Sequence, residues 1–175
     1  NPSSPVVDTA AHSMIVALSV LEGWTNYVAD CENAYLNVTE DQPRLVRVSQ
    51  AFMDIFVSLG FHNPNNSLIL AVQTGLYGYD DTGKNYQKLV GQVLTKVGFN
   101  QCPDDMCIWK YTEKDTIIIT SIHVDDFHFA TNNDTRFLHI FKQIQQYFAF
   151  NKFNEMNSFL GLSYTKTPSG INIGT

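Results

Sequence analysis

Two apolar runs separated by an acidic pair stand out in the pattern of hydrophobic and polar positions along this chain. Residues 117–124 are rich in β-branched side chains, residues 127–130 are again mostly apolar, and Asp125 and Asp126 lie between them. β-Branched residues favour pleated strands, so the pattern predicts a β-hairpin with two carboxylates at its tip. Neighbouring carboxylates repel each other and lose solvation when they are buried. The pair must therefore face water in the turn or be compensated by a cation.

The chain contains two other Asp–Asp pairs, and their surroundings are different. Residues 80–81 lie between Gly78 and Gly83, and residues 104–105 follow Pro103. Asp is common in such solvated turns and at helix caps. Only the pair at 125–126 is flanked on both sides by strand-like apolar residues. The contrast leaves two interpretations of that pair: a metal-binding or catalytic site, and a plain hairpin turn.

Apolar residues at helical spacing predict four helices. The first follows a cap at Asp8 or Thr9 and ends at Gly23, and the others cover 51–59, 83–97 and 135–147. The expected apolar faces, in chain order, are Met14, Ile15, Leu18 and Leu21; Phe52, Ile55, Phe56 and Leu59; Tyr86, Leu89, Val90, Val93, Leu94 and Val97; and Phe137, Ile140, Phe141 and Ile144.

Shorter apolar segments predict strands between and after these helices. In addition to the central hairpin, they cover residues 24–31, 45–48, 68–72, 106–111, 159–165 and 171–173. Residues 99–103 are predicted to form a loop, and the polar residues 151–157 an irregular segment. Helices and strands are mixed without strict alternation, which predicts the α+β fold class with an antiparallel sheet. We expect a single domain over residues 1–175.

The composition is that of a globular protein without a strongly basic surface. Apolar residues make up 44% and aromatic residues 13%, too many for a disordered chain. The net charge is −6, with 11 Lys and Arg, so either other parts of a larger protein supply nucleic-acid contacts or such binding is weak. Three cysteines without a CxxC pair favour a reducing, intracellular setting. The apolar runs are too short to cross a membrane, and the first residue, Asn1, predicts a piece of a longer polypeptide.

Several motifs, taken together and in this order, resemble the reverse transcriptase of Ty1/copia retrotransposons. In residues 29–36 an Asp is followed four positions later by Ala and five positions later by Tyr, which resembles the first catalytic motif of that family. The other matching segments are residues 4–8, the Leu-Tyr-Gly segment at 75–78 with 82–86, the Val-Asp-Asp segment at 123–126 and the Phe-Leu-Gly-Leu segment at 159–162. Each motif alone is weak, whereas the ordered set is specific.

The resemblance implies a polymerase-type palm, with an antiparallel sheet packed on helices, plus part of the fingers. It implies RNA-directed DNA synthesis with two Mg²⁺ ions, for which Mn²⁺ is a substitute, held by Asp30, Asp125 and Asp126. Carboxylate oxygens suit such hard cations, and paired ions suit phosphoryl transfer. By the same resemblance Tyr35 is a steric gate against ribose, and Lys84 binds the nucleotide. Without the resemblance, Asp30 at a strand end would be interpreted as a cap or as a catalytic carboxylate, the former being commoner, and Tyr35 as a core aromatic.

The resemblance also implies partners and a location. The expected partners are an RNA or DNA template–primer, deoxynucleoside triphosphates (dNTPs), and other domains of a polyprotein, namely a thumb, an RNase H domain and an integrase. A homo-oligomer is also possible, and no membrane partner is expected. The expected location is intracellular, either cytoplasmic within a virus-like particle or nuclear.

Two segments depart from the family pattern. Residues 79–81, Tyr-Asp-Asp, occupy a place where the family usually has basic and Gln residues, and Lys84 is the positive charge expected nearby. His123 replaces the usual aromatic before Val-Asp-Asp. These departures and the acidic balance favour an alternative, a domesticated or decayed, catalytically inactive reverse-transcriptase-like binding or scaffold module. A third hypothesis is a transition-metal site of His123, Asp125 and His128, although strand alternation places His128 on the opposite face.

Overall fold

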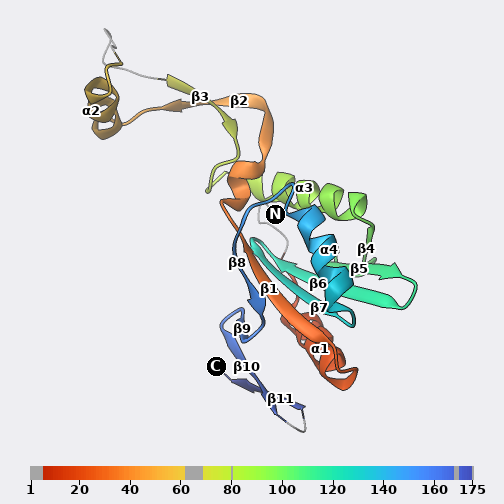
Figure 1. Cartoon of the computed structure of the whole chain (residues 1–175). Coiled ribbons are helices and arrows are strands. Elements are labelled where there is room, and N and C mark those ends of the chain that lie inside the picture. The colour runs from red at the N-terminus through yellow and green to blue at the C-terminus, as the bar shows by residue number, and fades with distance from the viewer. Residues whose placement is uncertain (1–5, 62–68, 80, 168–169, 175) are drawn as a thin grey trace.

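A six-stranded antiparallel sheet forms the centre of the computed structural model, which describes residues 6–61, 69–79, 81–167 and 170–174. The strand order is β4-β5-β6-β7-β1-β8, so the first strand in sequence lies between β7 and β8 (Figure 1). The bounds are β4 Phe99–Gln101, β5 Ile108–Glu113, β6 Thr116–His123, β7 Asp126–Thr131, β1 Thr25–Cys31 and β8 Phe150–Glu155. The predicted α+β class, antiparallel sheet and central hairpin are confirmed.

One face of this sheet carries the main core. Helices α3 (Thr82–Lys96) and α4 (Asp134–Ile144) bury their predicted apolar faces there against Phe127, Phe129 and neighbouring strand residues. Apart from Leu138 in α4, which is 39% exposed, the exposed residues of both helices are polar or charged, so the helical period alone was enough to identify the buried side. Within the described residues, no helix has the length and apolar character needed to cross a membrane.

Helix α1 (Thr9–Leu21) packs on the other face of the sheet, with a different side inward than predicted. Its cap is Asp8, whose side chain accepts hydrogen bonds from two backbone N–H groups, as predicted. The predicted buried stripe is right at Ile15 and wrong at the other three positions, because Met14 is 72%, Leu18 40% and Leu21 83% exposed. The helix instead buries His12, Ile15, Val16 and Ser19. The polar residues among them satisfy hydrogen bonds with polar side chains on the sheet, a requirement that local apolar spacing does not reveal.

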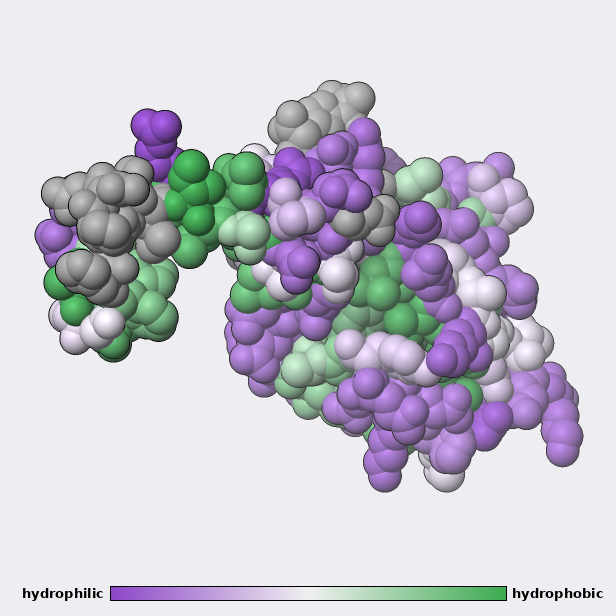
Figure 2. All heavy atoms as spheres, turned by 90° about the horizontal axis from the view of Figure 1, so that it is seen from above, coloured by the Kyte–Doolittle hydropathy of each residue, from purple (hydrophilic) through white to green (hydrophobic). Residues whose placement is uncertain are grey.

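A second, two-stranded sheet projects from the main body as an arm (Figure 1). It pairs β2 (Thr39–Arg47) with β3 (Ile69–Thr74), and α2 (Gln50–Ser58) lies between them in the chain. Of the residues in α2 only Met53 is buried, whereas Phe52 is 60% exposed. Figure 2 shows apolar side chains gathered on this arm. Strand β2 begins earlier than the predicted 45–48, and Leu68, the predicted start of β3, lies outside the described residues.

The C-terminal segment forms a three-stranded sheet in the order β11-β10-β9. Its strands are β9 Ser158–Phe159, β10 Leu162–Thr167 and β11 Gly170–Gly174, so the predicted strand at 159–165 is interrupted by a turn at Leu160 and Gly161. Two irregular segments were also predicted wrongly, because 99–101 form β4 and 150–155 form β8. Both are edge strands of the main sheet, where polar residues are tolerated, so their sequences lack the apolar alternation of inner strands.

Candidate active site

The register of the main sheet places Asp30 directly opposite Asp126. Strands β1 and β7 run antiparallel, and these two residues are the last pair of their ladder. Strands β6 and β7 turn at Val124 and Asp125, and the Asp125 carbonyl accepts a hydrogen bond of 2.8 Å from the Cys31 N–H group. The three acidic residues singled out in the sequence therefore come from two neighbouring strands at one end of the sheet. Their catalytic role remains a prediction.

The turn that carries the acidic pair is strained at Val124. Its φ angle is +59°, in the left-handed region that β-branched residues rarely adopt. Two-residue hairpin turns of this kind normally place Gly at such a position. Backbone strain of this kind persists only where the surrounding structure enforces it, and it is concentrated at functional sites. The strand pairing on both sides of β7 and the hydrogen bond between Cys31 and Asp125 supply that constraint here.

Asp126 lies in a half-buried and acidic environment that shifts its pKa. Partial burial raises the pKa of Asp126 above its usual range, and the negative charges of Asp125 and Asp30 raise it further. The positive charges of His123 and Lys152 act in the opposite direction. The three carboxylates are thus close enough to affect one another, and the protein's own cations compensate them only in part.

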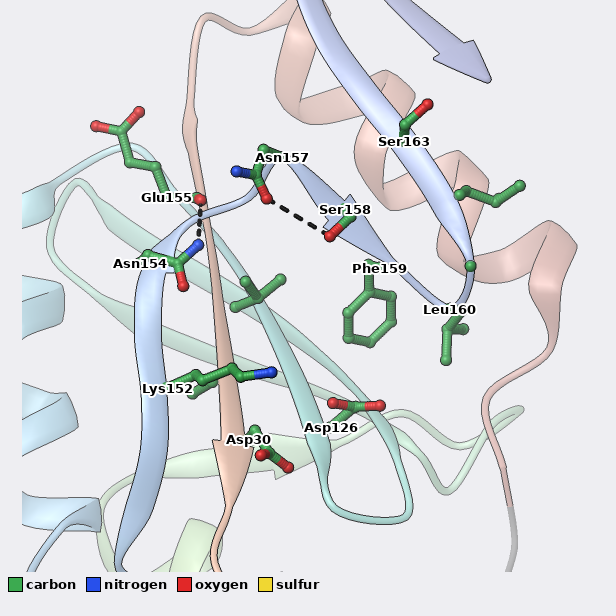
Figure 3. Close-up of a pocket in the computed structure, with 14 residues that line it drawn as sticks. Asp30, Asp126, Lys152, Asn154, Glu155, Asn157, Ser158, Phe159, Leu160 and Ser163 are labelled. Atoms are coloured by element: carbon green, nitrogen blue, oxygen red, sulfur yellow. Dashed lines mark hydrogen bonds between the residues drawn. The ribbon is translucent and has the colours of Figure 1, made fainter. Parts of the chain in front are cut away.

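A cavity of about 810 Å³ opens beside Asp30 and Asp126. Its walls come from β1, β8 and the β9–β10 hairpin, including Phe159 and Leu160 (Figure 3). Lys152 on β8 pairs in register with Asp30, and Figure 3 shows its side chain extending toward the two carboxylates. Sequence reasoning missed Lys152 because it lies in a polar edge strand that was expected to be irregular.

The carboxylate oxygens at this end of the sheet are of the chemical type that hard divalent cations prefer. Among the residues that the structure describes, no group of three or more His, Cys, Asp or Glu side chains is placed so that it could hold a metal ion. Mg²⁺ is commonly held by only one or two carboxylates, with water and substrate phosphates completing its shell. Asp30 and Asp126, with Asp125 adjacent, offer carboxylates of this kind on the wall of an open cavity.

Tyr35 lies against the Leu-Tyr-Gly segment, although 40 residues separate the two motifs in the chain. It belongs to a short 3₁₀ helix, Ala34–Asn37, and its ring centroid is 4.5 Å from that of Tyr77. At Gly75 an added Cβ would lie 2.6 Å from the Tyr35 carbonyl oxygen and 2.6 Å from Thr82 Cγ2. Only glycine allows this close approach. Gly75 therefore brings the motif that contains Tyr35 into contact with the Leu-Tyr-Gly segment and the start of α3.

Asp81, in the acidic segment after Gly78, lies close to a positively charged side chain that the sequence did not reveal. Lys84 is exposed in the first turn of α3, close in sequence to Asp81. In addition, Arg44 of β2 lies 3.7 Å from the Asp81 carboxylate and 4.6 Å from the centre of the Tyr79 ring. The expectation that Lys84 alone compensates this segment is therefore wrong. Asp80 lies outside the described residues.

The hypothesis of a transition-metal site using His128 is wrong. His128 is fully buried, and both of its ring nitrogens are within hydrogen-bonding distance of other side chains, Ser121 Oγ at 3.3 Å and Asn26 Oδ1 at 2.8 Å. A nitrogen engaged in this way is not free to bind a metal together with His123 and Asp125.

Comparison with known proteins gives one positive result. A protein-family model described as "Reverse transcriptase (RNA-dependent DNA polymerase)" matches residues 1–175, the whole chain. Neither a curated protein nor a solved structure matches. The family match covers the acidic strand ends, the cavity and the arm alike.

Proposed function

We propose that this chain carries the catalytic part of an RNA-directed DNA polymerase. The premise is that the chain belongs to the reverse transcriptase family typical of Ty1/copia retrotransposons. The observation that supports this proposal most strongly is the pairing of Asp30 with Asp126 across β1 and β7, with Asp125 in the adjoining turn. In this proposal the six-stranded sheet and its helices form the palm. The arm of β2, β3 and α2 is part of the fingers, and all belong to one domain.

The acidic residues would hold two Mg²⁺ ions in the active enzyme. When bound, such ions lower the pKa of the primer 3′-hydroxyl and neutralise the triphosphate. The protein's own contribution is position: the β1–β7 ladder holds Asp30 and Asp126 face to face, and the strained turn fixes Asp125 beside them. Lys152 adds a positive charge at the rim, where the phosphates of a primer or nucleotide would enter the cavity.

Tyr35 and Lys84 are proposed to bind the incoming dNTP. The Tyr35 ring packs on the Tyr77 ring, and the close approach of Gly75 to the Tyr35 carbonyl fixes the backbone that carries the ring. A ring held in this way would pack under the deoxyribose and clash with a ribose 2′-hydroxyl. Lys84, exposed at the start of α3, would add a positive charge for the triphosphate. Arg44 already neutralises part of the acidic segment nearby.

The proposal is tested by single-nucleotide extension with the complete natural polypeptide. A primer–template and one dNTP are incubated while Mg²⁺ or Mn²⁺ is titrated, and extension that depends on the ion is expected. Replacing the dNTP by a ribonucleotide tests the gate, because Tyr35→Val should raise ribonucleotide incorporation by about tenfold or more. Absence of extension at every ion concentration would reject the enzymatic function.

An inactive binding or scaffold module is the alternative function. The net charge of −6 and the acidic residues after Gly78 favour it. The ion pair between Arg44 and Asp81 weakens the second argument, because it reduces the negative charge near the proposed nucleotide site. The two functions differ in their response to metal, since only the enzyme requires thermal stability to rise with added Mg²⁺.

The isolated chain is expected to bind primer–template weakly and with little salt dependence. Phosphate contacts provide most nucleic-acid affinity, and each one steepens the fall of affinity with salt. With 11 Lys and Arg against 17 Asp and Glu, the chain offers few such contacts. A fluorescence titration at low and moderate salt measures both quantities. Tight binding with a steep salt slope would show that the charged surface is arranged far more favourably than its net charge suggests.

A further inference from the structure

The hairpin of β9 and β10 forms one wall of the cavity and depends on support from outside itself. Its strands share only two paired positions, and its turn has positive φ angles at Leu160 (+51°) and Gly161 (+76°). A non-glycine residue is strained in that conformation, and a hairpin this short is not stable alone. β11 pairs with β10 and extends this sheet, and the position of the wall relative to Asp30 and Asp126 then depends on what lies behind the hairpin.

His12 of α1 lies behind the hairpin and contacts both of its strands. Its ring stacks on Phe159 with centroids 4.6 Å apart, and its Nε2 lies 3.2 Å from the Tyr164 hydroxyl. His12 is fully buried, Tyr164 is 5% exposed and Phe159 is 6% exposed. A buried histidine thus joins the cavity wall to α1 by one stacking contact and one hydrogen bond.

The hydrogen bonds continue from His12 into the strands that carry the carboxylates. Far from the hairpin, Asn26 Nδ2 donates to Ser19 Oγ at 2.8 Å, and the Ser19 hydroxyl donates to the Val16 carbonyl at 2.7 Å. Asn26 Oδ1 is then an acceptor for His128 Nε2 at 2.8 Å, so that nitrogen must carry the proton. Asn26 lies on β1 and His128 on β7, the two strands that end in Asp30 and Asp126.

The proton positions in the part of the network closest to the hairpin follow from the same assignment of donors and acceptors. With its proton on Nε2, neutral His128 accepts at Nδ1 from the Ser121 hydroxyl at 3.3 Å. The Ser121 oxygen then accepts from His12 Nδ1 at 3.0 Å, which leaves His12 Nε2 to accept from the Tyr164 hydroxyl. In this assignment each hydroxyl or N–H group donates to the next residue of the network, from Tyr164 through His12, Ser121, His128, Asn26 and Ser19 to the Val16 carbonyl. Burial lowers the pKa of His12 to about 4, which keeps it neutral as this arrangement requires.

We propose that His12 is a positioning residue for the cavity beside the carboxylates: through Tyr164 and Phe159 it holds the β9–β10 wall in place relative to Asp30 and Asp126. In the polymerase, and therefore resting on the function proposed above, this wall would support the primer terminus. His12 touches neither substrate nor metal in this account. It acts by linking the wall to the same strands that present the catalytic carboxylates.

Hydrogen exchange of residues 158–165 tests this inference without relying on activity. In His12→Phe, which keeps a ring over Phe159 but removes both polar nitrogens, exchange in the hairpin is expected to rise on the order of tenfold. Tyr164→Phe, a milder change, should raise it in the same direction. His12→Gln retains an acceptor for the Tyr164 hydroxyl and should restore most of the protection.

Ser19→Ala is the matched control, because Ser19 is equally buried on the same helix and belongs to the same network at its far end. It should lower global stability yet leave exchange in the hairpin within about twofold of wild type. In primer extension, His12→Phe should raise KM for primer–template more than it lowers kcat, and Ser19→Ala should leave this KM unchanged.

Three results separate the possible failures. Equal acceleration of hairpin exchange in Ser19→Ala and His12→Phe would overturn the positioning role, because the effect would then be general loosening. Unchanged exchange in both His12→Phe and Tyr164→Phe would overturn it as well. If the expected exchange pattern appears but no protein extends a primer, the proposed polymerase function fails and the support of the wall by His12 stands.

Discussion

Asp126→Asn is expected to abolish primer extension, with a loss of about a thousandfold or more, while the metal-free protein stays folded and becomes more stable. The loss follows because metal-ion stabilisation of phosphoryl transfer provides several kcal/mol, and the substitution removes a charged ligand oxygen. The gain in stability follows because burial, together with repulsion from Asp125 and Asp30, raises the pKa of Asp126 in the folded chain. Asp125→Asn should behave in the same way, since it removes one member of the same pair.

The stability gain has a predicted dependence on pH. The pKa of Asp126 is raised above its ordinary value of 3.8, so ionisation of this group favours the unfolded chain. Its stabilising contribution is complete below that value and is lost as pH rises through the raised pKa. The difference in thermal stability between Asp126→Asn and wild type should therefore be small at the lowest pH where both are folded. It should grow through the raised pKa and then stay constant.

Asp104→Asn provides the control, because it changes the same charge at the exposed member of another Asp–Asp pair, away from the cavity. It should leave extension unchanged and show no comparable pH-dependent gain. Added Mg²⁺ should stabilise wild type and Asp104→Asn but not Asp126→Asn. Two results together would favour the inactive module instead: a thermal stability of the wild type that does not change with tens of millimolar Mg²⁺, and a complete polypeptide that extends no primer.

Gly75→Ala is expected to destabilise the fold by about 2–3 kcal/mol and to disturb nucleotide selection together with it. The added Cβ would lie 2.6 Å from the Tyr35 carbonyl oxygen and from Thr82 Cγ2, closer than real Cβ atoms approach such neighbours. The carbonyl belongs to the backbone that carries the proposed gate, so relief of the clash must displace either the Leu-Tyr-Gly segment or Tyr35. Chemical denaturation measures the first effect, and ribonucleotide incorporation the second.

Two further variants make this prediction specific. Thr82→Ser removes the Cγ2 atom and keeps the hydroxyl, so Gly75→Ala should cost less in that background but should still be unfavourable because of the Tyr35 oxygen. Gly91→Ala in α3 meets only the Trp109 ring, at 3.3 Å, and alanine also favours the helix, so its cost should be much smaller. Equal effects at the two glycines would mean that the close contact at Gly75 is not what matters.

The parts of the fold that sequence predicted correctly are those where one local signal dominates. Helices α3 and α4 have mostly polar or charged outer faces and mainly aliphatic or aromatic inner faces, so a period of 3.6 identifies their buried side. The central hairpin has β-branched and aromatic strands around a polar turn. The acidic pair and the ordered motifs then identified the reverse transcriptase family, which the match over residues 1–175 confirms.

The parts that only the tertiary structure decided are those where partners come from distant segments. The inward face of α1 depends on polar side chains of the sheet. His12 is buried because it is hydrogen-bonded to Ser121, and Ser19 because it is hydrogen-bonded to Asn26, whereas Met14 stays exposed. Lys152 reaches the carboxylates only because a polar edge strand pairs with β1. Periodicity indicates which side chains are shielded from water. The placements of His12 and Lys152 depend instead on a hydrogen bond and on strand pairing with residues more than a hundred positions away in the chain.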